Sequence, residues 1–160
     1  MSQPALKLQP ELVLEQVELT PDLVEEALPL IQAHWEEVNA NDKYEINPDW
    51  YQYFELQVAG MLKVFTARYD GELVGYMSWF VSLSMHKAGV YVANEDALFV
   101  KKTKRGMMAG MKLIKFSEEF LRENTKANTF VLRVKTTHDF GKYLTRLGYG
   151  LKEMIYAKEY

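Results

Sequence analysis

The sequence predicts an α/β (α+β) fold, in which helices cover both faces of a mixed, mostly antiparallel twisted sheet. Asp70-Gly71 separates the strand-like runs 62–69 and 72–84, and this dipeptide is the strongest short-range signal for an antiparallel hairpin. A third strand-like run, 90–100, leads through a glycine-containing turn into an amphipathic run that precedes another strand-like run. Because a strand–helix–strand unit joins parallel strands, the sheet is expected to be mixed.

Length and composition are those of one domain. The chain has 160 residues, of which 48% are hydrophobic, and this is enough for a single core. We therefore expect residues 1–160 to form one domain. Residues 1–10 are expected to be a loose arm, because Pro4 and Pro10 discourage regular structure.

The N-terminal third begins with an expected strand and a long helix. Residues 11–19 alternate in a way that is compatible with a strand. Thr20 is expected to cap a helix that begins at Pro21 and runs toward Val38. Pro29 lies inside this helix and predicts a kink or a break just before it.

A polar loop and a second helix are expected next. Residues 39–47 are polar, and Pro48 is expected to start the helix with Asn47 as its cap. Gly60 is a plausible end for this helix.

The remaining elements follow from their residue patterns. β-Branched and aromatic residues or clear alternation predict strands, and a three-and-four spacing of apolar residues predicts helices. The expected elements are strands at 62–69, 72–84, 90–100, 129–135 and 151–160, and helices at 105–122 and 140–147. The full order is therefore β-α-α-β-β-β-α-β-α-β.

Composition excludes several classes of protein. There are no cysteines, which rules out disulfides, thiolate metal sites and cysteine nucleophiles and is typical of a cytoplasmic protein. Three scattered histidines give no metal-ligand spacing, so no metal is expected. The N-terminus lacks a signal-peptide pattern, and no apolar run is long enough to predict a membrane span.

Charge is distributed unevenly along the chain. Residues 1–60 carry twelve acidic and two basic side chains, whereas residues 61–160 carry ten acidic and seventeen basic ones. Both halves are compatible with ordinary solvated faces. The alternative is a molecule with one side that binds anions and another that attracts cations.

A basic turn is the strongest candidate for a binding site. Lys101, Lys102, Lys104 and Arg105 follow an apolar strand-like run and precede the glycine-containing start of the expected helix at 105–122. Backbone N–H groups at such a helix start, with its dipole, form a site for a phosphate or pyrophosphate. The simpler interpretation is a surface turn with solvated cations.

The same turn resembles the acetyl-coenzyme A signature of the GNAT family of N-acetyltransferases. Val100, Arg105, Gly106 and Gly110 have the spacing of that signature, and Met108 stands where the family usually has its middle glycine. The resemblance implies acetyl-CoA as co-substrate and extends over about residues 11–160. It implies that the cofactor is bound by Leu98, Phe99, Val100, Lys104, Arg105, Gly106, Met107, Met108, Ala109 and Gly110.

The resemblance implies direct transfer of an acetyl group to a primary amine in a ternary complex. The amine must lose a proton, and Asp96 is favoured over Glu95 as the base because strand alternation places it on the face of Leu98. Tyr143 is the candidate acid, although the tyrosine of the family pattern falls at Leu144. The alternatives are that the two acids only pair with lysines or cap strand ends, and that Tyr143 is an aromatic residue that packs in the core or against the cofactor.

The acceptor site is expected in the acidic, aromatic region of the chain. Aromatic residues interleaved with acids favour a cationic, partly apolar acceptor, such as a polyamine, an amino-sugar-like molecule or a lysine or N-terminal amine of a protein. The candidate residues are Trp35, Glu36, Tyr44, Trp50 and Tyr53. The alternative is that the aromatic residues belong to the core and the acids are solvated.

Two other functions compete with catalysis. Met108 and the missing tyrosine at 144 favour a catalytically weak or inactive protein that binds coenzyme A or a protein partner. A nucleic-acid module that uses residues 101–105 is disfavoured by the net charge of −3. We expect no nucleic-acid or membrane partner, and the resemblance implies a possible homodimer.

Overall fold

Five strands form one sheet in the described part of the chain, residues 11–39 and 42–160 of a computed structural model. In order across the sheet they are β1 (Leu12–Val17), β2 (Leu62–Tyr69), β3 (Glu72–Leu83), β4 (Tyr91–Val100) and β5 (Ala127–Val131). The pairs β1–β2, β2–β3 and β3–β4 are antiparallel, and the pair β4–β5 is parallel. The expected loose arm at 1–10 lies outside the described residues.

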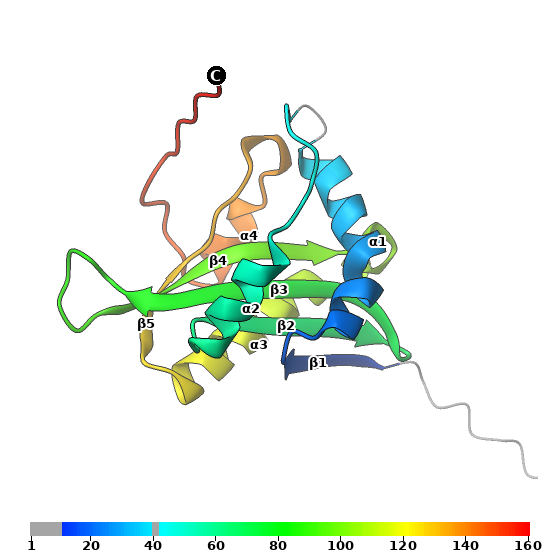
Figure 1. Cartoon of the computed structure of the whole chain (residues 1–160), viewed down its shortest axis with the longest axis horizontal. Coiled ribbons are helices and arrows are strands. Elements are labelled where there is room, and N and C mark those ends of the chain that lie inside the picture. The colour runs from blue at the N-terminus through cyan, green and yellow to red at the C-terminus, as the bar shows by residue number, and fades with distance from the viewer. Residues whose placement is uncertain (1–10, 40–41) are drawn as a thin grey trace, which may run out of the picture.

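Helices cover both faces of this sheet (Figure 1). Helices α1 (Pro21–Val38) and α2 (Trp50–Val58) lie on one face, and α3 (Ala109–Asn124) and α4 (Gly141–Arg146) lie on the other. The predicted fold class is thus confirmed, as is the order of elements up to α4. Among the residues described, no helix has the length and apolar character needed to cross a membrane.

The core is divided by the sheet. On the α3 face, Phe65, Met77 and Trp79 pack with Leu113 of α3 and related buried residues. Trp79 Nε1 donates to Ser117 Oγ on α3 at 2.9 Å, so the buried indole is satisfied. The α1–α2 face has two smaller buried clusters, one under each helix, and residues of both clusters line one cavity.

The first two helices differ from their expected bounds. α1 continues through Pro29 as one helix, so it has no break there. α2 begins at Trp50 and not at Pro48, because Asp49 is its N-cap and its carboxylate accepts from the Gln52 N–H at 3.1 Å. Asn47 was the expected cap, so that assignment is wrong, and the helix start moves by two residues.

The C-terminal residues 151–160 form no strand, which corrects the last expected element. They extend away from the sheet, as Figure 1 shows, and Leu151 and Tyr156 are 87% and 88% exposed. Alternation alone makes a segment compatible with a strand, but a strand also needs a neighbour for its hydrogen bonds. The preceding strand is shorter than its expected range 129–135 and ends at Val131.

Candidate active site

The end of β4 has an open edge. β4 pairs with β3 from Tyr91 to Val100, but its pairing with β5 spans only Tyr91 to Asn94. In the described chain, residues 95–100 therefore have no strand partner on the β5 side. Backbone N–H and C=O groups along such an edge can pair with an extended ligand that contains amides.

A β-bulge at Asp96 changes which side chains face the site. Ser78 pairs with Ala97 while the next residue, Trp79, pairs with Glu95, so Asp96 is the extra residue on β4. Strict alternation predicts that Glu95 and Asp96 face opposite sides of the sheet. Glu95 pairs with Trp79 of the α3-face core, whereas Asp96 bonds to Ser78 and Tyr53 on the α1–α2 face, so the two acids do face opposite sides. The bulge reverses both relative to Leu98, and the expectation that Asp96 shares the face of Leu98 is therefore wrong. Both acids line the cavity.

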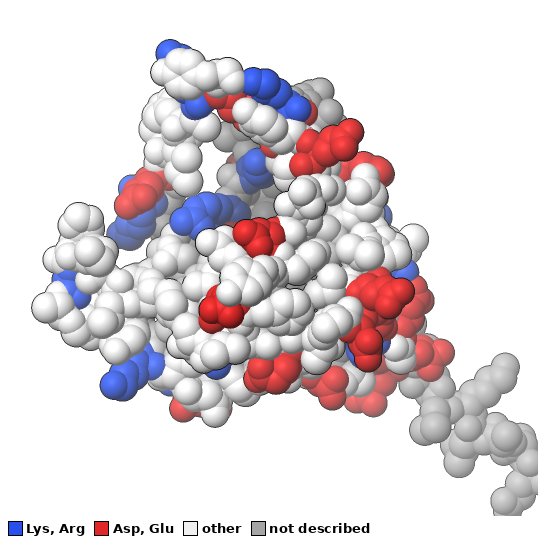
Figure 2. Space-filling view, viewed as in Figure 1, with Lys and Arg blue, Asp and Glu red and all other residues white. Residues whose placement is uncertain are grey.

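The cavity has a volume of about 690 Å³ and lies between α1, α2 and the sheet. It reaches the point where β4 and β5 diverge, and residues 133–136 line it there. Ile155 and Ala157 of the C-terminal segment also contribute to its wall. Figure 2 shows the molecule hollowed beneath this segment, with basic side chains in the hollow. The volume is in the range of small-molecule sites.

Glu95 is the buried acid of this cavity. It is 8% exposed, and its Oε2 accepts from the backbone N–H of Arg133 at 3.2 Å. Burial is the main cause that raises the pKa of Glu95 to about 7; the Arg133 amide lowers this pKa, and the charge of Asp96 raises it. A carboxylate that is half ionised near neutral pH is suited to accept a proton.

Asp96 has a different environment. Its Oδ2 accepts two hydrogen bonds, from Ser78 Oγ at 2.8 Å and from Tyr53 Oη of α2 at 3.0 Å. Burial is the main cause that raises the pKa of the Tyr53 phenol, and the Asp96 charge adds to it, so this proton stays on Tyr53. Asp96 is thus held by two hydroxyl groups, while Glu95 is held by a backbone amide.

The basic turn leads directly into the start of α3. Residues Lys102–Met107 form a short 3₁₀ helix, and α3 begins at Ala109, so the expectation of a helix from Arg105 is wrong. The turn between them is made by Met108, which has left-handed φ and ψ angles of 56° and 27°. No side chain of the described residues caps α3, and its first-turn N–H groups remain available to an anion.

The cations of this turn already have partners. The Arg105 guanidinium donates to both carboxylate oxygens of Glu37 at 2.8 and 2.9 Å, and its Nε donates to Val100 O at 2.9 Å. Lys101 pairs with Glu72. The Lys104 ammonium lies 4.1 Å from the centre of a tyrosine ring on β2. The turn is therefore tied to the end of α1 and to the β2–β3 hairpin.

These features match a known family. Residues 25–149 match the sequence profile of the acetyltransferase (GNAT) family. The chain belongs to this family. No protein among the curated sequences matches the chain.

Solved structures support the GNAT fold of the chain. An aminoglycoside acetyltransferase from an uncultured soil metagenomic sample, in complex with sisomicin, is 20% identical with a TM-score of 0.67, over 93% of this chain and 95% of that one. A ribosomal-protein-alanine N-acetyltransferase from Brucella melitensis biovar Abortus 2308 is 18% identical with a TM-score of 0.69. The match covers 94% of this chain and 99% of that one. A glucosamine-6-phosphate N-acetyltransferase from Arabidopsis thaliana is 11% identical with a TM-score of 0.67. The match covers 94% of this chain and 99% of that one.

Met108 stands at the middle glycine position of the GNAT signature, and its backbone explains the glycine. The positive φ of 56° is one that glycine adopts without the strain caused by a Cβ atom. The Met108 side chain is 55% exposed, so it points to solvent and packs little against the helix. The turn is thus formed with methionine in a conformation that favours glycine.

Met108→Gly is expected to leave the free energy of unfolding unchanged, because relief of strain offsets the greater chain entropy of glycine. Met107→Gly is the matched control; Met107 lies within the 3₁₀ helix without a positive φ, and we expect a loss of about 1 kcal/mol there. Urea unfolding of both variants gives the comparison. Equal losses at the two positions would show that Met108 is not strained.

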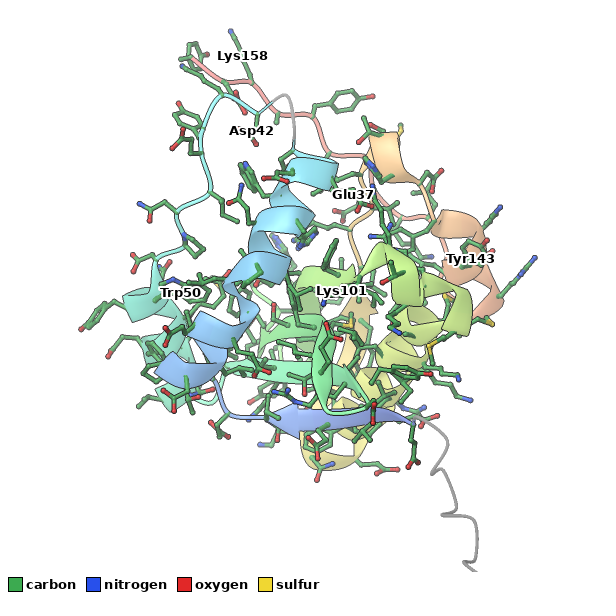
Figure 3. All side chains as sticks on the ribbon, turned by 90° about the vertical axis from the view of Figure 1, so that its right-hand side faces the viewer. Glu37, Asp42, Trp50, Lys101, Tyr143 and Lys158 are labelled. Atoms are coloured by element: carbon green, nitrogen blue, oxygen red, sulfur yellow. The ribbon has the colours of Figure 1, made fainter. Side chains whose placement is uncertain are left out.

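Tyr143, the predicted acid, lies on the outer side of α4. It is 37% exposed, and the Lys142 and Arg146 side chains lie over its ring, whereas the neighbouring Leu144 is buried. Figure 3 shows Tyr143 at the outer edge of the molecule, on the side opposite Trp50. Since one helical residue turns a side chain by about 100°, Leu144 occupies the inward position.

The predicted acceptor residues divide into two groups. Trp35, Trp50 and Tyr53 line the cavity. Glu36 is exposed on α1, where it accepts from Gln32 at 2.8 Å, and Tyr44 is 58% exposed. Aromatic residues of this region therefore face the cavity more than its acids do.

Sequence reasoning missed several residues of the cavity. The strands contribute Thr66 and Ser78, and α1 contributes His34, whose Nδ1 lies 2.8 Å from Tyr76 Oη. Polar residues within apolar strands were the available signal for Thr66 and Ser78. In residues 11–39 and 42–160, no cluster of His, Asp and Glu side chains is arranged to hold a metal ion.

Proposed function

We propose that this protein is an acetyl-CoA-dependent N-acetyltransferase that acetylates a primary amine. The observation that carries the proposal is the open edge of β4, which leads from Glu95 in the cavity to the uncapped start of α3. One extended ligand with amides in its arm and a pyrophosphate at its end is complementary to this path. Membership of the GNAT family supports the same ligand.

The cofactor is proposed to bind by its backbone contacts. The pantetheine amides would pair with the edge of residues 95–100, which include Leu98, Phe99 and Val100. The pyrophosphate would accept from first-turn N–H groups of α3, including those of Ala109 and Gly110, with Lys104 nearby. Gly106 and Met107 lie in the 3₁₀ helix that leads to this point.

Glu95 is proposed as the general base, in preference to Asp96. An amine with a pKa near about 10 is mostly protonated at pH 7, so it must lose a proton before or during attack. The ammonium first releases one proton to solvent. The neutral amine nitrogen then forms a bond to the thioester carbonyl carbon, the carbon–sulfur bond breaks, and the second proton lost by nitrogen finally resides on sulfur. Glu95 accepts that proton, directly or through water, while Asp96 and its two hydroxyl partners position the acceptor.

The test measures release of free coenzyme A from acetyl-CoA over a panel of amines. The panel includes alkylamines, diamines, an amino sugar and a lysine peptide, with the corresponding alcohols as negative controls. Turnover of at least one amine that depends on Glu95 supports the proposal. Failure of acetyl-CoA to bind by calorimetry would overturn it.

A coenzyme A-binding protein without turnover is the second candidate. The outward position of Tyr143 favours it, because Leu144 occupies the inward position where the family pattern has a tyrosine. Calorimetric binding of coenzyme A with no turnover of any amine in the panel would select this candidate.

Glu37→Gln is expected to tighten coenzyme A binding by about two- to fivefold. The change releases Arg105 from its ion pair and removes a negative charge beside the turn, and exposed ion pairs contribute about 0.2–1 kcal/mol. Calorimetry gives the Kd, and Glu25→Gln, on the exposed part of α1, is the control. Weaker binding would mean that Glu37 holds Arg105 in its productive position.

A further inference from the structure

The cavity has a charged end and an apolar end. Among the described residues that line it, every Asp, Glu, Lys and Arg comes from β4 or from the residues after β5. They are Glu95, Asp96, Arg133 and Lys135. His34 of α1 also lines the cavity and is neutral at pH 7, because burial is the main cause that lowers its pKa to about 4. The charged end is therefore also the end where acetyl transfer is proposed.

The opposite end lies over β2 and is walled by apolar side chains. The lining residues there are Leu19, Leu23, Val24, Trp50 and Val64. All five belong to the buried cluster between β2 and the first two helices. None of the acids on the fully described helix α1 lines the cavity. Thr66 of β2 does line it, but its hydroxyl oxygen is buried and offers no contact to a ligand. A second charge on a ligand would thus find no partner among the described residues at this end.

Tyr53 connects the two ends. Its hydroxyl donates to Asp96 at 3.0 Å, and the centre of its ring lies 5.5 Å from the centre of the Trp50 ring. Asp96 directly follows the proposed base Glu95 on β4, so an ammonium held by Asp96 is the one that lies at the transfer site. The group that this amine carries then extends along Tyr53 toward Trp50. The body of the acceptor therefore meets aromatic rings and aliphatic side chains.

We propose that the acceptor is a primary monoamine whose body is apolar and about the size of an aromatic ring, as in an arylalkylamine. Its ammonium binds to Asp96, and its ring packs between Tyr53, Trp50 and the aliphatic wall. Of the two protons that the ammonium loses, one goes to solvent and one to the coenzyme A sulfur, as in the proposed function. Polyamines and amino sugars are disfavoured, because a second charge or several hydroxyl groups would be buried without partners. This inference rests on the proposed function and names its substrate class.

The experiment compares 2-phenylethylamine with 1,4-diaminobutane at saturating acetyl-CoA. The wild type should use 2-phenylethylamine with a kcat/KM at least about fiftyfold higher, since burial of its ring removes roughly 150 Å² of apolar surface from water. Val24→Glu places a carboxylate at the apolar end, and it should lower this preference at least tenfold. Leu28→Glu is the matched control on the same helix, because Leu28 is 47% exposed and lies outside the cavity. It should leave the preference within twofold. The wild-type comparison tests the inference even if Val24→Glu does not fold.

Binding separates this inference from the proposed function. Each amine is titrated by calorimetry into the protein loaded with coenzyme A, for the wild type and both variants. Tighter binding of 2-phenylethylamine that Val24→Glu weakens, without turnover of any amine, would support the inference and overturn the proposed function. Equal use of the two amines, better use of 1,4-diaminobutane or an amino sugar, or a preference that Val24→Glu leaves unchanged would overturn the inference and leave the function intact. Absence of both turnover and binding would overturn both.

Discussion

Glu95→Gln lowers the kcat of acetyl transfer at pH 7 by about a hundredfold to a thousandfold, which is the usual loss when a general base is removed. Glutamine has the shape of glutamate and can still accept from the Arg133 N–H, so the loss reports the missing base. The KM for acetyl-CoA should change less than threefold. Steady-state kinetics with the best amine of the panel give both values.

The dependence of kcat on pH in the wild type should show the protonation of Glu95. The pKa of Glu95 is raised to about 7, mainly by burial, so kcat falls as the pH drops below about 7 and the carboxylate is protonated. This limb should be absent from the residual activity of Glu95→Gln. The charge of the free amine affects kcat/KM at higher pH, and for that reason the comparison uses kcat at saturating amine.

Two variants test the assignment of roles to the carboxylates. Asp96→Asn should raise the KM for the amine more than it lowers kcat, because Asp96 is proposed to position the acceptor. Glu119→Gln, an exposed acid on α3, should leave both parameters unchanged. If Asp96→Asn removes the limb near pH 7 and Glu95→Gln does not, Asp96 is the base.

The fold was predictable because its signals are local. The Asp70-Gly71 turn, the capped start of α1 at Thr20 and the alternation of β2 each depend on a few neighbouring residues. Their order along the chain then leaves few possible topologies. The prediction of a strand at residues 151–160 was wrong because alternation is a local pattern, whereas a strand also needs a neighbouring strand for its hydrogen bonds.

The candidate site depended on contacts that sequence patterns do not contain. Arg105 pairs with Glu37, 68 positions earlier, and the roles of Glu95 and Asp96 depend on a bulge opposite β3. A bulge adds one residue to one strand, and strict alternation cannot predict it. Met108 is an exception, because here the sequence did point to a structural feature. Met108 stands where the family usually has a glycine, and it is the one residue of this turn with a positive φ.

The free energy of unfolding should be nearly independent of pH between about 4.5 and 6.5, because two buried groups oppose each other. Burial is the main cause that lowers the pKa of His34 from 6.5 to about 4, so His34 contributes stability above pH 6.5 that is lost as the pH falls toward 4. Burial raises the pKa of Glu95 from 4.5 to about 7, so its contribution is present below pH 4.5 and is lost as the pH rises toward 7. Each amounts to about 3 kcal/mol, with opposite sign.

Replacing either Glu95 or His34 should therefore expose the pH dependence of stability that comes from the other residue. In Glu95→Gln, the free energy of unfolding should rise with pH at about 1.4 kcal/mol per unit between pH 4.5 and 6.5, which is the contribution of His34 alone. In His34→Gln, which can still bond to Tyr76, it should fall with a similar slope. Urea unfolding across this pH range measures both, and the double variant should be flat. The exposed His86→Gln is the control. Parallel curves for wild type and single variants would mean that neither group titrates differently on folding, and would remove the support that burial gives to Glu95 as the base.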